Sequence, residues 1–398
     1  MNTRLQVEHP VTEAITGTDL VEAMLSVGAG RGLPGRLQNF TESIVPFEGH
    51  ALEARIYAED PLRGFLPSTG SLSQYVEPDH SEFPYSRERP YIRLDSGVQP
   101  GYTVTSHYDP MISKLISYGT DRGESIDQLR RALDSYVIEG VQHNCRLVQS
   151  VLREPMFIEG NTPTSFLTTH YPDQFSGVVL EPFETEELAV SAAVIAEARR
   201  IQFERPALVG NGEDDAVVVR LGGQFGDAYR VAIEGSAANV RKLDLTTGES
   251  ISDPRSIEVA DLSYLPAQYR ASLSLNESHR TIQVLNEEIT GELKLQMYGH
   301  TTFALVQSPL EFELSRQYMQ EPPAIDTSSL VQSPMPGLLV SYAVKPGDIV
   351  EEGQELCIVE SMKMQNMIRS PRNGTIGTCD CTEGSSVRVD QTILTFEA

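Results

Sequence analysis

Residues 330–398 are divided by turn signals into short segments rich in apolar and β-branched residues. The turns contain Pro346-Gly347, Glu352-Gly353, Asn373-Gly374 and Glu383-Gly384. Glycine and asparagine adopt the backbone dihedrals that tight turns need, and short apolar segments between such turns are typical of strands. We expect strands at 338–344, 356–361, 364–369, 375–381 and 393–396. The pattern therefore predicts a small all-β domain at this end of the chain.

Lys363 lies between two of these expected strands, 356–361 and 364–369, so it should occupy the tip of a tight hairpin. A hairpin tip holds a lysine away from rigid support, as a modifying enzyme requires. Met362 and Met364 flank it with apolar, adaptable side chains that suit docking to several partners. The alternative is an ordinary exposed turn lysine, and the local pattern alone leaves both readings open.

The first residues alternate between two kinds of side chain. Asn2, Arg4, Gln6 and Glu8 are polar, and the residues between them are mostly apolar. Period-two alternation predicts a strand whose polar side chains share one face. That face could simply be solvated. Its composition also suits anion chemistry, because an arginine fork binds planar oxyanions and a carboxylate can act as a base.

The rest of the chain separates into three regions. Residues 1–175 mix strands and helices, with helices expected at 19–27 (capped by Thr18), 124–139 and from 162 to before Pro172. In residues 176–325 a long helix is expected from Thr185 to Pro206, with Arg199 and Arg200 in its last turn. Evenly spaced short strands are expected after it, at 216–221, 228–233, 239–245, 281–285, 292–297 and 302–307, and they indicate an antiparallel barrel or sandwich. Residues 321–329 read as a linker of proline and serine. The third region, 326–398, contains the all-β domain.

Composition excludes some classes of protein. The net charge of −25, from 56 acidic and 31 basic residues, argues against a nucleic-acid binder. No apolar run approaches the roughly 18–20 residues that cross a bilayer. Cys145, Cys357, Cys379 and Cys381 lack the spacing of a zinc site, so we expect reduced thiols. The first ten residues read as a strand, so we expect no targeting segment there.

Met362-Lys363-Met364, preceded by Pro334-Met335-Pro336-Gly337, resembles the biotinyl domain of biotin-dependent carboxylases. Lipoyl domains share that fold but resemble Asp-Lys-Ala at this position. The resemblance implies that biotin protein ligase attaches biotin to Lys363. Ser361 departs from the family, which most often has alanine there, and serine is small enough to fit.

The first ten residues resemble the biotin carboxylase signature of ATP-grasp enzymes. The resemblance implies that Asn2 helps coordinate the Mg²⁺ or Mn²⁺ held on ATP. It implies that Arg4, Gln6 and the backbone of Val7 bind bicarbonate, and that Glu8 is the base that deprotonates it. Arg55 matches the arginine that stabilises the enolate of the biotin ring, although such an arginine could instead pair with Glu59 or Asp60. The segment Tyr108–Ile116 also matches the family in order, without a catalytic role.

The family places its glycine-rich ATP loop and a second metal carboxylate before the segment that matches Met1. Gly28, Gly30 and Gly32 follow an expected helix and match a phosphate loop only weakly. The resemblance therefore predicts the carboxyl-terminal portion of a longer subunit. Such a portion should not bind ATP normally or make carboxyphosphate alone.

The order of segments predicts a multidomain α+β chain. The resemblance implies the C-terminal part of a biotin carboxylase domain (1–175), a helix-plus-β-barrel domain that docks the carboxyltransferase β subunit (176–325), and a biotinyl barrel sandwich (326–398). Segments 136–144 and 326–329 are most similar to the subunits that serve propionyl-CoA. Another acyl-CoA, such as 3-methylcrotonoyl-CoA, and a non-catalytic carrier or assembly module stay open as alternatives. We expect a hetero-oligomer without nucleic-acid or membrane partners, in the mitochondrial matrix of a eukaryote or otherwise in the cytoplasm.

Overall fold

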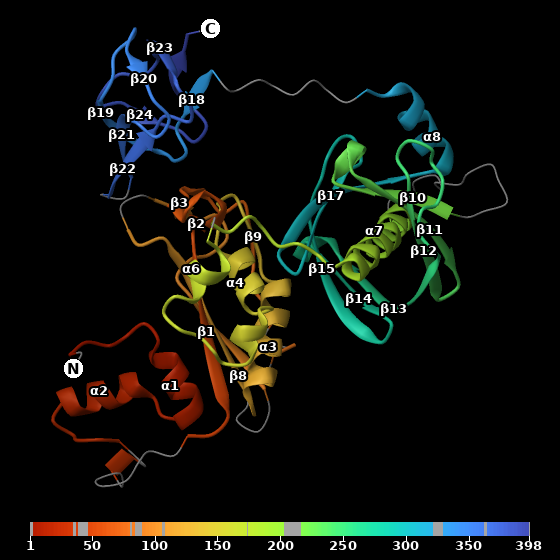
Figure 1. The fold of residues 1–398 in the computed structure, drawn as a ribbon. Coiled ribbons are helices and arrows are strands. Elements are labelled where there is room, and N and C mark those ends of the chain that lie inside the picture. Colours follow the sequence, from red (N-terminus) through yellow and green to blue (C-terminus); the bar gives the residue numbers. More distant parts are fainter. Residues whose placement is uncertain are drawn as a thin grey trace.

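The computed structural model describes residues 3–34, 37–38, 47–79, 82–83, 90–105, 108–172, 174–202, 216–320, 329–361 and 364–397. These residues form three bodies, each with its own buried core. In Figure 1 the first occupies the lower left, the barrel lies at the right and the all-β domain lies at the upper left. None of the described helices is both long and apolar enough to span a bilayer.

The first body is built on a three-stranded antiparallel sheet in the order β1 (His50–Tyr57), β8 (Met111–Gly119), β6 (Tyr91–Ser96). One face is covered by α3 (Arg122–Ser135), which buries Ile126, Leu129 and Leu133 against the apolar side chains of the sheet. These three residues have the helical spacing expected from the sequence. The opposite face of the sheet carries charged side chains and contacts the first helix, α1 (His9–Thr16).

Shorter elements complete this body. They are β2 (Glu59–Asp60), η2 (Pro61–Arg63), β3 (Leu66–Pro67), β4 (Gly70–Ser71), β5 (Gln74–Val76), β7 (Thr103–Val104), β9 (Val137–Glu139), α4 (Cys145–Val151), α5 (Pro155–Ile158) and α6 (Phe166–His170). The helix expected over 124–139 was therefore wrong at its end, because Tyr136 is extended and the following residues pair with β5 as strand β9. The helix expected from 162 begins later, at Phe166.

Two helices precede the sheet, α1 (His9–Thr16) and α2 (Leu20–Gly28). The expected cap Thr18 is replaced by Asp19, whose carboxylate accepts a hydrogen bond from the Glu22 backbone N–H at 2.7 Å. The apolar stripe of α2 is only partly covered, since Met24 and Val27 are each 51% exposed. The described part of the chain therefore leaves one face of α2 open.

The second body is a closed antiparallel barrel in which each strand pairs with the next. Its strands are β10 (Ala216–Leu221), β11 (Asp227–Glu234), β12 (Ala237–Leu243), β13 (Arg255–Leu265), β14 (Arg270–Leu275), β15 (Ser278–Glu287), β16 (Leu293–Met297) and β17 (His300–Gln307). Two further elements accompany them, η3 (Gly223–Phe225) and η4 (Pro266–Gln268). The sequence predicted six of the strands and missed β13 and β14. Of the two predicted alternatives, a barrel or a sandwich, the structure shows the barrel.

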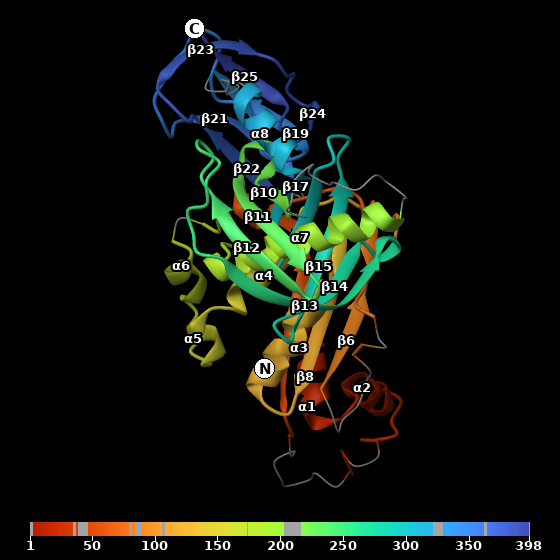
Figure 2. The ribbon, with the colours of Figure 1, turned by 90° about the vertical axis from the view of Figure 1, so that its right-hand side faces the viewer.

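A long helix, α7 (Pro182–Gln202), packs inside this barrel (Figures 1 and 2). It touches seven of the eight strands, and its buried residues share one core with them. Ala189, Ala192 and Ala193 are among those residues, and their small side chains let a helix fit within so narrow a barrel. The helix begins three residues before the expected Thr185, and Arg199 and Arg200 lie in its last turn as expected. The helix α8 (Pro309–Tyr318) follows the barrel and begins with a capping box formed by Ser308 and Glu311.

The third body contains two four-stranded sheets, in the orders β18-β25-β23-β20 and β22-β21-β19-β24. Their strands are β18 (Leu330–Gln332), β19 (Gly337–Tyr342), β20 (Ile349–Val350), β21 (Glu355–Ser361), β22 (Met364–Arg369), β23 (Gly374–Cys379), β24 (Ser386–Val387) and β25 (Thr392–Phe396). The sheets enclose one apolar core. The prediction of a small all-β domain is confirmed, and the short strands β18, β20 and β24 were missed.

Candidate functional site

One face of the sheet β1-β8-β6 carries charged residues in adjacent positions. The strand register places Arg55 opposite Lys114, and Lys114 opposite Asp95. Two residues along on the same face, Glu53 and Arg93 flank Ile116 in the same way. Cross-strand neighbours are close enough to interact. Antiparallel pairing therefore gathers five charged side chains into one cluster, namely Glu53, Arg55, Arg93, Asp95 and Lys114.

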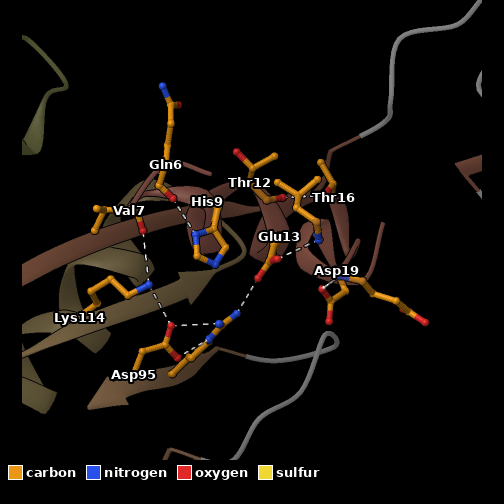
Figure 3. Close-up of polar contacts among 12 residues, drawn as sticks. Gln6, Val7, His9, Thr12, Glu13, Thr16, Asp19, Asp95 and Lys114 are labelled. Atoms are coloured by element: carbon orange, nitrogen blue, oxygen red, sulfur yellow. Dashed lines mark hydrogen bonds and ion pairs between the residues drawn. The ribbon is translucent and has the colours of Figure 1, made fainter. Parts of the chain in front are cut away.

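The N-terminal segment, residues 3–8, is bound to this cluster by two contacts. The Arg55 guanidinium donates to the Glu8 carboxylate at 2.8 Å. The Lys114 ammonium donates to the backbone carbonyl of Val7 at 3.4 Å and pairs with Asp95 at 3.1 Å. Figure 3 shows Lys114 between Val7 and Asp95, with Glu13 of α1 directed to the same charged region.

Glu13 makes the link from α1 to the sheet. Its carboxylate accepts a hydrogen bond from Arg93 at 2.8 Å, and its side chain is only 10% exposed. Arg93 also donates from Nε to Asp95 at 2.8 Å. A chain of alternating charges therefore runs from Glu13 through Arg93 and Asp95 to Lys114, and it fixes the position of residues 7 and 8.

Ion pairing and burial shift the pKa values of these carboxyl groups in opposite directions, and ion pairing prevails for Asp95 but not for Glu53. Burial favours the neutral form of Asp95, but hydrogen bonds from Arg93 and Lys114 lower its pKa overall. The hydrogen bond to Asp95 is the main reason that the pKa of Arg93 is raised. Burial raises the pKa of Glu53, although Arg55 donates to it at 3.2 Å. The cluster thus holds fixed charges beside a carboxyl group that binds a proton more readily than usual.

A cavity of about 820 Å³ lies between the N-terminal segment and α2. Arg4, Gln6 and Glu8 line it, together with apolar residues of α2. The structure therefore brings three of the residues expected to bind or deprotonate bicarbonate to one cavity. Arg55 joins them through its ion pair with Glu8.

The expected N-terminal strand was wrong within the described residues. Residues 3–8 form a bend and a turn, and α1 begins at His9. Pro10 is in the first turn of α1, where its fixed dihedral favours a helix and its missing N–H costs nothing. His9 Nδ1 also lies 2.7 Å from the Gln6 carbonyl, which stabilises the turn. Thr3 and Leu5 line the same cavity as Arg4 and Gln6, so the expected division into two faces is absent there.

The alternative partners considered for Arg55 are not the ones that it contacts. Arg55 binds Glu8 and Glu53. Asp60 instead caps η2 by accepting from the Leu62 backbone N–H at 3.0 Å. The guanidinium is thus directed to the N-terminal segment.

Sequence reasoning missed the residues that hold this segment in place. Lys114 was quoted within a matching segment without a role, and Arg93, Asp95 and Glu13 were not singled out. The only local signal for them is the Arg93-x-Asp95 spacing, which puts both side chains on one face of a strand. Their partners lie in other elements, so the register of the sheet was needed to find them.

The second candidate site is the turn between β21 and β22. Ser361 pairs with Met364, so the two strands are consecutive and pair up to their adjoining ends. The predicted hairpin is confirmed, whereas Lys363 lies outside the described residues. The Ser361 side chain is buried and its hydroxyl has no hydrogen-bond partner among the described residues.

The hairpin rests on a close backbone contact. Gly337 packs against the end of β21, where a Cβ atom would lie 2.5 Å from the Glu360 carbonyl oxygen. Only glycine permits this approach. The neighbouring Met335 is buried in the core of the domain. The end of β21 that leads toward position 363 is therefore held by close packing.

The described residues were also tested as metal ligands. Among them, no three His, Cys, Asp or Glu side chains gather in an arrangement that could hold an ion. Asn2, the expected ligand, lies outside the described residues. Burial raises the pKa of Cys145 and of Cys357 to about 12, so both thiols stay protonated near neutral pH.

Three family models match the chain. Residues 1–36 match the carbamoyl-phosphate synthase L chain ATP-binding domain, residues 53–169 the biotin carboxylase C-terminal domain, and residues 329–396 the biotin-requiring enzyme family. The first two matches include both sides of the Glu8–Arg55 contact. The third contains the β21–β22 hairpin.

Individual relatives match over the whole chain. The mitochondrial propionyl-CoA carboxylase alpha chain of Rattus norvegicus is 37% identical over 100% of this chain and 51% of its own length. The propionyl-CoA carboxylase alpha chain of Ruegeria pomeroyi is 36% identical over 100% of this chain and 58% of its own. The mitochondrial methylcrotonoyl-CoA carboxylase subunit alpha of Arabidopsis thaliana is 30% identical over 97% of this chain and 54% of its own. The chain spans about half the length of these curated relatives.

Proposed function

We propose that the chain belongs to the family of biotin-dependent carboxylases and forms part of the biotin-bearing alpha subunit of a propionyl-CoA carboxylase. The observation that carries the proposal is the similarity to propionyl-CoA carboxylase alpha chains along the entire chain. That similarity includes the barrel, which lies between the segments matched by family models. The methylcrotonoyl-CoA carboxylase relative is less similar, at 30% identity.

We assign the covalent attachment of biotin to Lys363. The pairing of Ser361 with Met364 supports this assignment, because position 363 falls between the last pair of the two strands β21 and β22. Bound biotin supplies a ureido nitrogen that carries a carboxyl group between two reaction centres. The chain's own contribution is a rigid domain that offers this arm at one end.

We assign the binding of bicarbonate to Arg4, Gln6 and the backbone of Val7, with Glu8 as the base. The shared cavity supports the first part, since a guanidinium and an amide on one wall suit a planar anion. The contact of Lys114 with the Val7 carbonyl fixes the backbone at this point. We also assign metal coordination to Asn2, which is a proposal from the family resemblance alone.

Arg55 is proposed to have two successive partners. In the described structure it binds the carboxylate of Glu8 at 2.8 Å. While that ion pair persists, the engaged oxygen of Glu8 is not available to accept a proton. An anionic substrate group that attracts the guanidinium would release Glu8 to act as a base, and would place a fixed cation where negative charge develops.

The remaining proposals concern partners. We assign the barrel and α7 to docking of a carboxyltransferase β subunit, so that the complete enzyme is a hetero-oligomer. Biotin protein ligase, ATP and bicarbonate are the other expected partners, and in a eukaryote the site of action would be the mitochondrial matrix. Co-purification with a β subunit that carboxylates propionyl-CoA supports the proposal. Recovery only with one that carboxylates 3-methylcrotonoyl-CoA would move the chain to that enzyme.

The attachment site is tested by Lys363→Arg, which keeps the positive charge and removes the amine that can be acylated. We expect complete loss of the mass added by biotin and of the streptavidin signal, with unchanged thermal unfolding. Lys345→Arg, in the same domain, is the matched control and should leave the signal intact. Biotin retained in the Lys363 variant places the attachment elsewhere and removes the basis of the carrier assignment.

A further inference from the structure

Within the described ranges, Arg63 and Leu66 of the first body contact the all-β domain. The Arg63 guanidinium of η2 lies 3.1 Å from the Asp390 carboxylate and 3.4 Å from the carbonyl oxygen of Pro334. Leu66 of β3 packs against the apolar core of the all-β domain. Figure 1 shows β2 and β3 directly beside this domain. A charged contact and an apolar contact therefore meet on one short segment, residues 60–67.

This segment is shaped by its own hydrogen bonds. Strands β2 and β3 pair, with Asp60 opposite Leu66. Phe65 has a φ of 63° and donates its backbone N–H to the Asp60 carbonyl at 2.8 Å. Asp60 caps η2 and also lies 3.8 Å from Arg63. The turn thus holds Arg63 and Leu66 on a compact projection.

The surface that meets this projection is the hairpin end of the all-β domain. Asp390 donates its backbone N–H to the Ser333 carbonyl at 2.8 Å, and Pro334 follows Ser333 directly. Gly337, three residues on, contacts the end of β21 at Glu360. The segments that touch Arg63 are therefore neighbours of the strand that leads into the 362–363 loop.

We infer that residues 60–67 are a docking surface for the carrier domain of the same chain, which holds the hairpin end of that domain beside the first body. Its role in a carboxylation cycle rests on the proposed function, whereas the contact does not. Between residues 329 and 398 there are nine acidic and five basic residues, so a basic residue on the projection complements the charge of this domain.

The contact is suited to reversible docking. Arg63 is 41% exposed and Asp390 is 59% exposed, and ion pairs that are this exposed stabilise only weakly. Because both partners belong to one chain, a high effective concentration keeps even a weak contact populated. A carrier that must leave and return requires this combination.

A zero-length carbodiimide cross-link tests the docking, because it joins an amine to a carboxylate only when they touch. In the Arg63→Lys chain we expect a 63–390 link, about tenfold more abundant than links from position 63 to other carrier acids, as docking rather than tethering requires. Asp390→Asn should abolish it, and added salt should reduce it. Arg31→Lys, exposed elsewhere in the first body, should give no link to position 390.

A second variant leaves both cross-linking groups in place. Leu66→Ser in the Arg63→Lys chain removes the apolar contact and should lower the yield several-fold, whereas Leu62→Ser, at a residue that is 43% exposed, should not. Links spread evenly over the carrier acids, or a yield unaffected by Leu66→Ser, would overturn the inference. The cross-link does not require biotin, so an unmodified Lys363 would contradict the proposed function and leave the docking result standing.

Discussion

The β21–β22 hairpin and the N-terminal segment are both candidate sites, but they are held in place by different kinds of contact. The hairpin is formed by residues that are close in sequence, since Ser361 pairs with Met364 and Glu360 with Gln365. The N-terminal segment depends on distant residues. Glu8 and Arg55 are 47 positions apart, and Val7 and Lys114 are 107 apart. The first site is therefore a property of one small domain, and the second is a property of a whole sheet.

This difference predicts separate responses to mutation. A change inside the all-β domain should affect biotin attachment and leave the charged cluster intact. A change in the cluster should release the N-terminal segment and leave biotin attachment intact. The variants below test this separation in order of expected effect.

Gly337→Ala should have the largest effect. The added Cβ would lie 2.5 Å from the Glu360 carbonyl oxygen and 2.8 Å from a methyl group of Val359, so the backbone must move. We expect a loss of about 2–4 kcal/mol in the stability of the all-β domain, comparable to other overpacked sites, and a lower rate of biotin attachment. Differential scanning calorimetry and a streptavidin assay measure these effects.

Gly28→Ala is the control for that variant, because a Cβ at position 28 meets nothing within 4 Å. The melting temperature of the all-β domain should be the same in this variant as in the unmodified chain. Normal melting of Gly337→Ala would mean that the close contact with β21 is not required for the hairpin.

Arg93→Met should have the next largest effect, and it acts on the other site. The variant keeps the aliphatic length but leaves Glu13 and Asp95 without their shared partner. Glu13 is only 10% exposed, so an unpaired carboxylate there should cost about 1–3 kcal/mol. We expect faster hydrogen exchange in α1 and unchanged biotin attachment.

Arg200→Met provides the comparison for Arg93→Met, since Arg200 pairs with Glu197 within a single helix. It should leave the exchange of α1 as it is. Equal protection of α1 in both variants would show that the charged cluster does not hold the N-terminal segment.

The same division explains which parts could be predicted from the sequence. The β21–β22 hairpin was predictable because two expected strand segments adjoin Lys363 in the sequence. The strands β10 and β22 were predicted with their observed bounds. The N-terminal strand was wrong because alternation alone does not supply a pairing partner, and Pro10 favours the start of a helix. The place of Lys114 and Arg93 in the charged cluster could be found only from the pairing register of β8 and β6.

Asp134 is a buried residue at the interface with the barrel, and its carboxyl group makes the stability of this interface depend on pH. Burial raises the pKa of Asp134 to about 7, although Arg130, Arg153 and Arg280 oppose the shift. Its carboxylate accepts from Gln149 at 2.7 Å, and Gln283 of β15 donates to its backbone carbonyl at 3.1 Å. Like the N-terminal segment, this contact joins elements that are distant in sequence.

Asp134→Asn should remove part of the pH dependence of stability. The folded chain keeps the proton on Asp134 at pH values where the unfolded chain has lost it, so wild-type stability falls as pH rises between about 4 and 7. The variant cannot lose this proton. We therefore expect the two proteins to be closest near pH 4 and the variant to gain on the order of 1 kcal/mol by pH 8. A difference in melting temperature that stays constant from pH 4 to pH 8 would contradict this assignment.

Ser361→Ala should have the smallest effect, and it tests the local site most finely. The Ser361 side chain is 2% exposed, and its hydroxyl oxygen lacks a hydrogen-bond partner among the described residues. Removing a buried hydroxyl that makes no hydrogen bond should stabilise the all-β domain by about 0.5–1 kcal/mol. Biotin attachment should be unchanged, because the pairing with Met364 uses only backbone atoms. Ser370→Ala is the matched control, since the buried Ser370 donates to the Arg372 carbonyl at 2.6 Å and its loss should destabilise the domain. If Ser361→Ala destabilises the domain as Ser370→Ala does, the Ser361 hydroxyl has a hydrogen-bond partner, and the end of β21 is held by more than its pairing with β22.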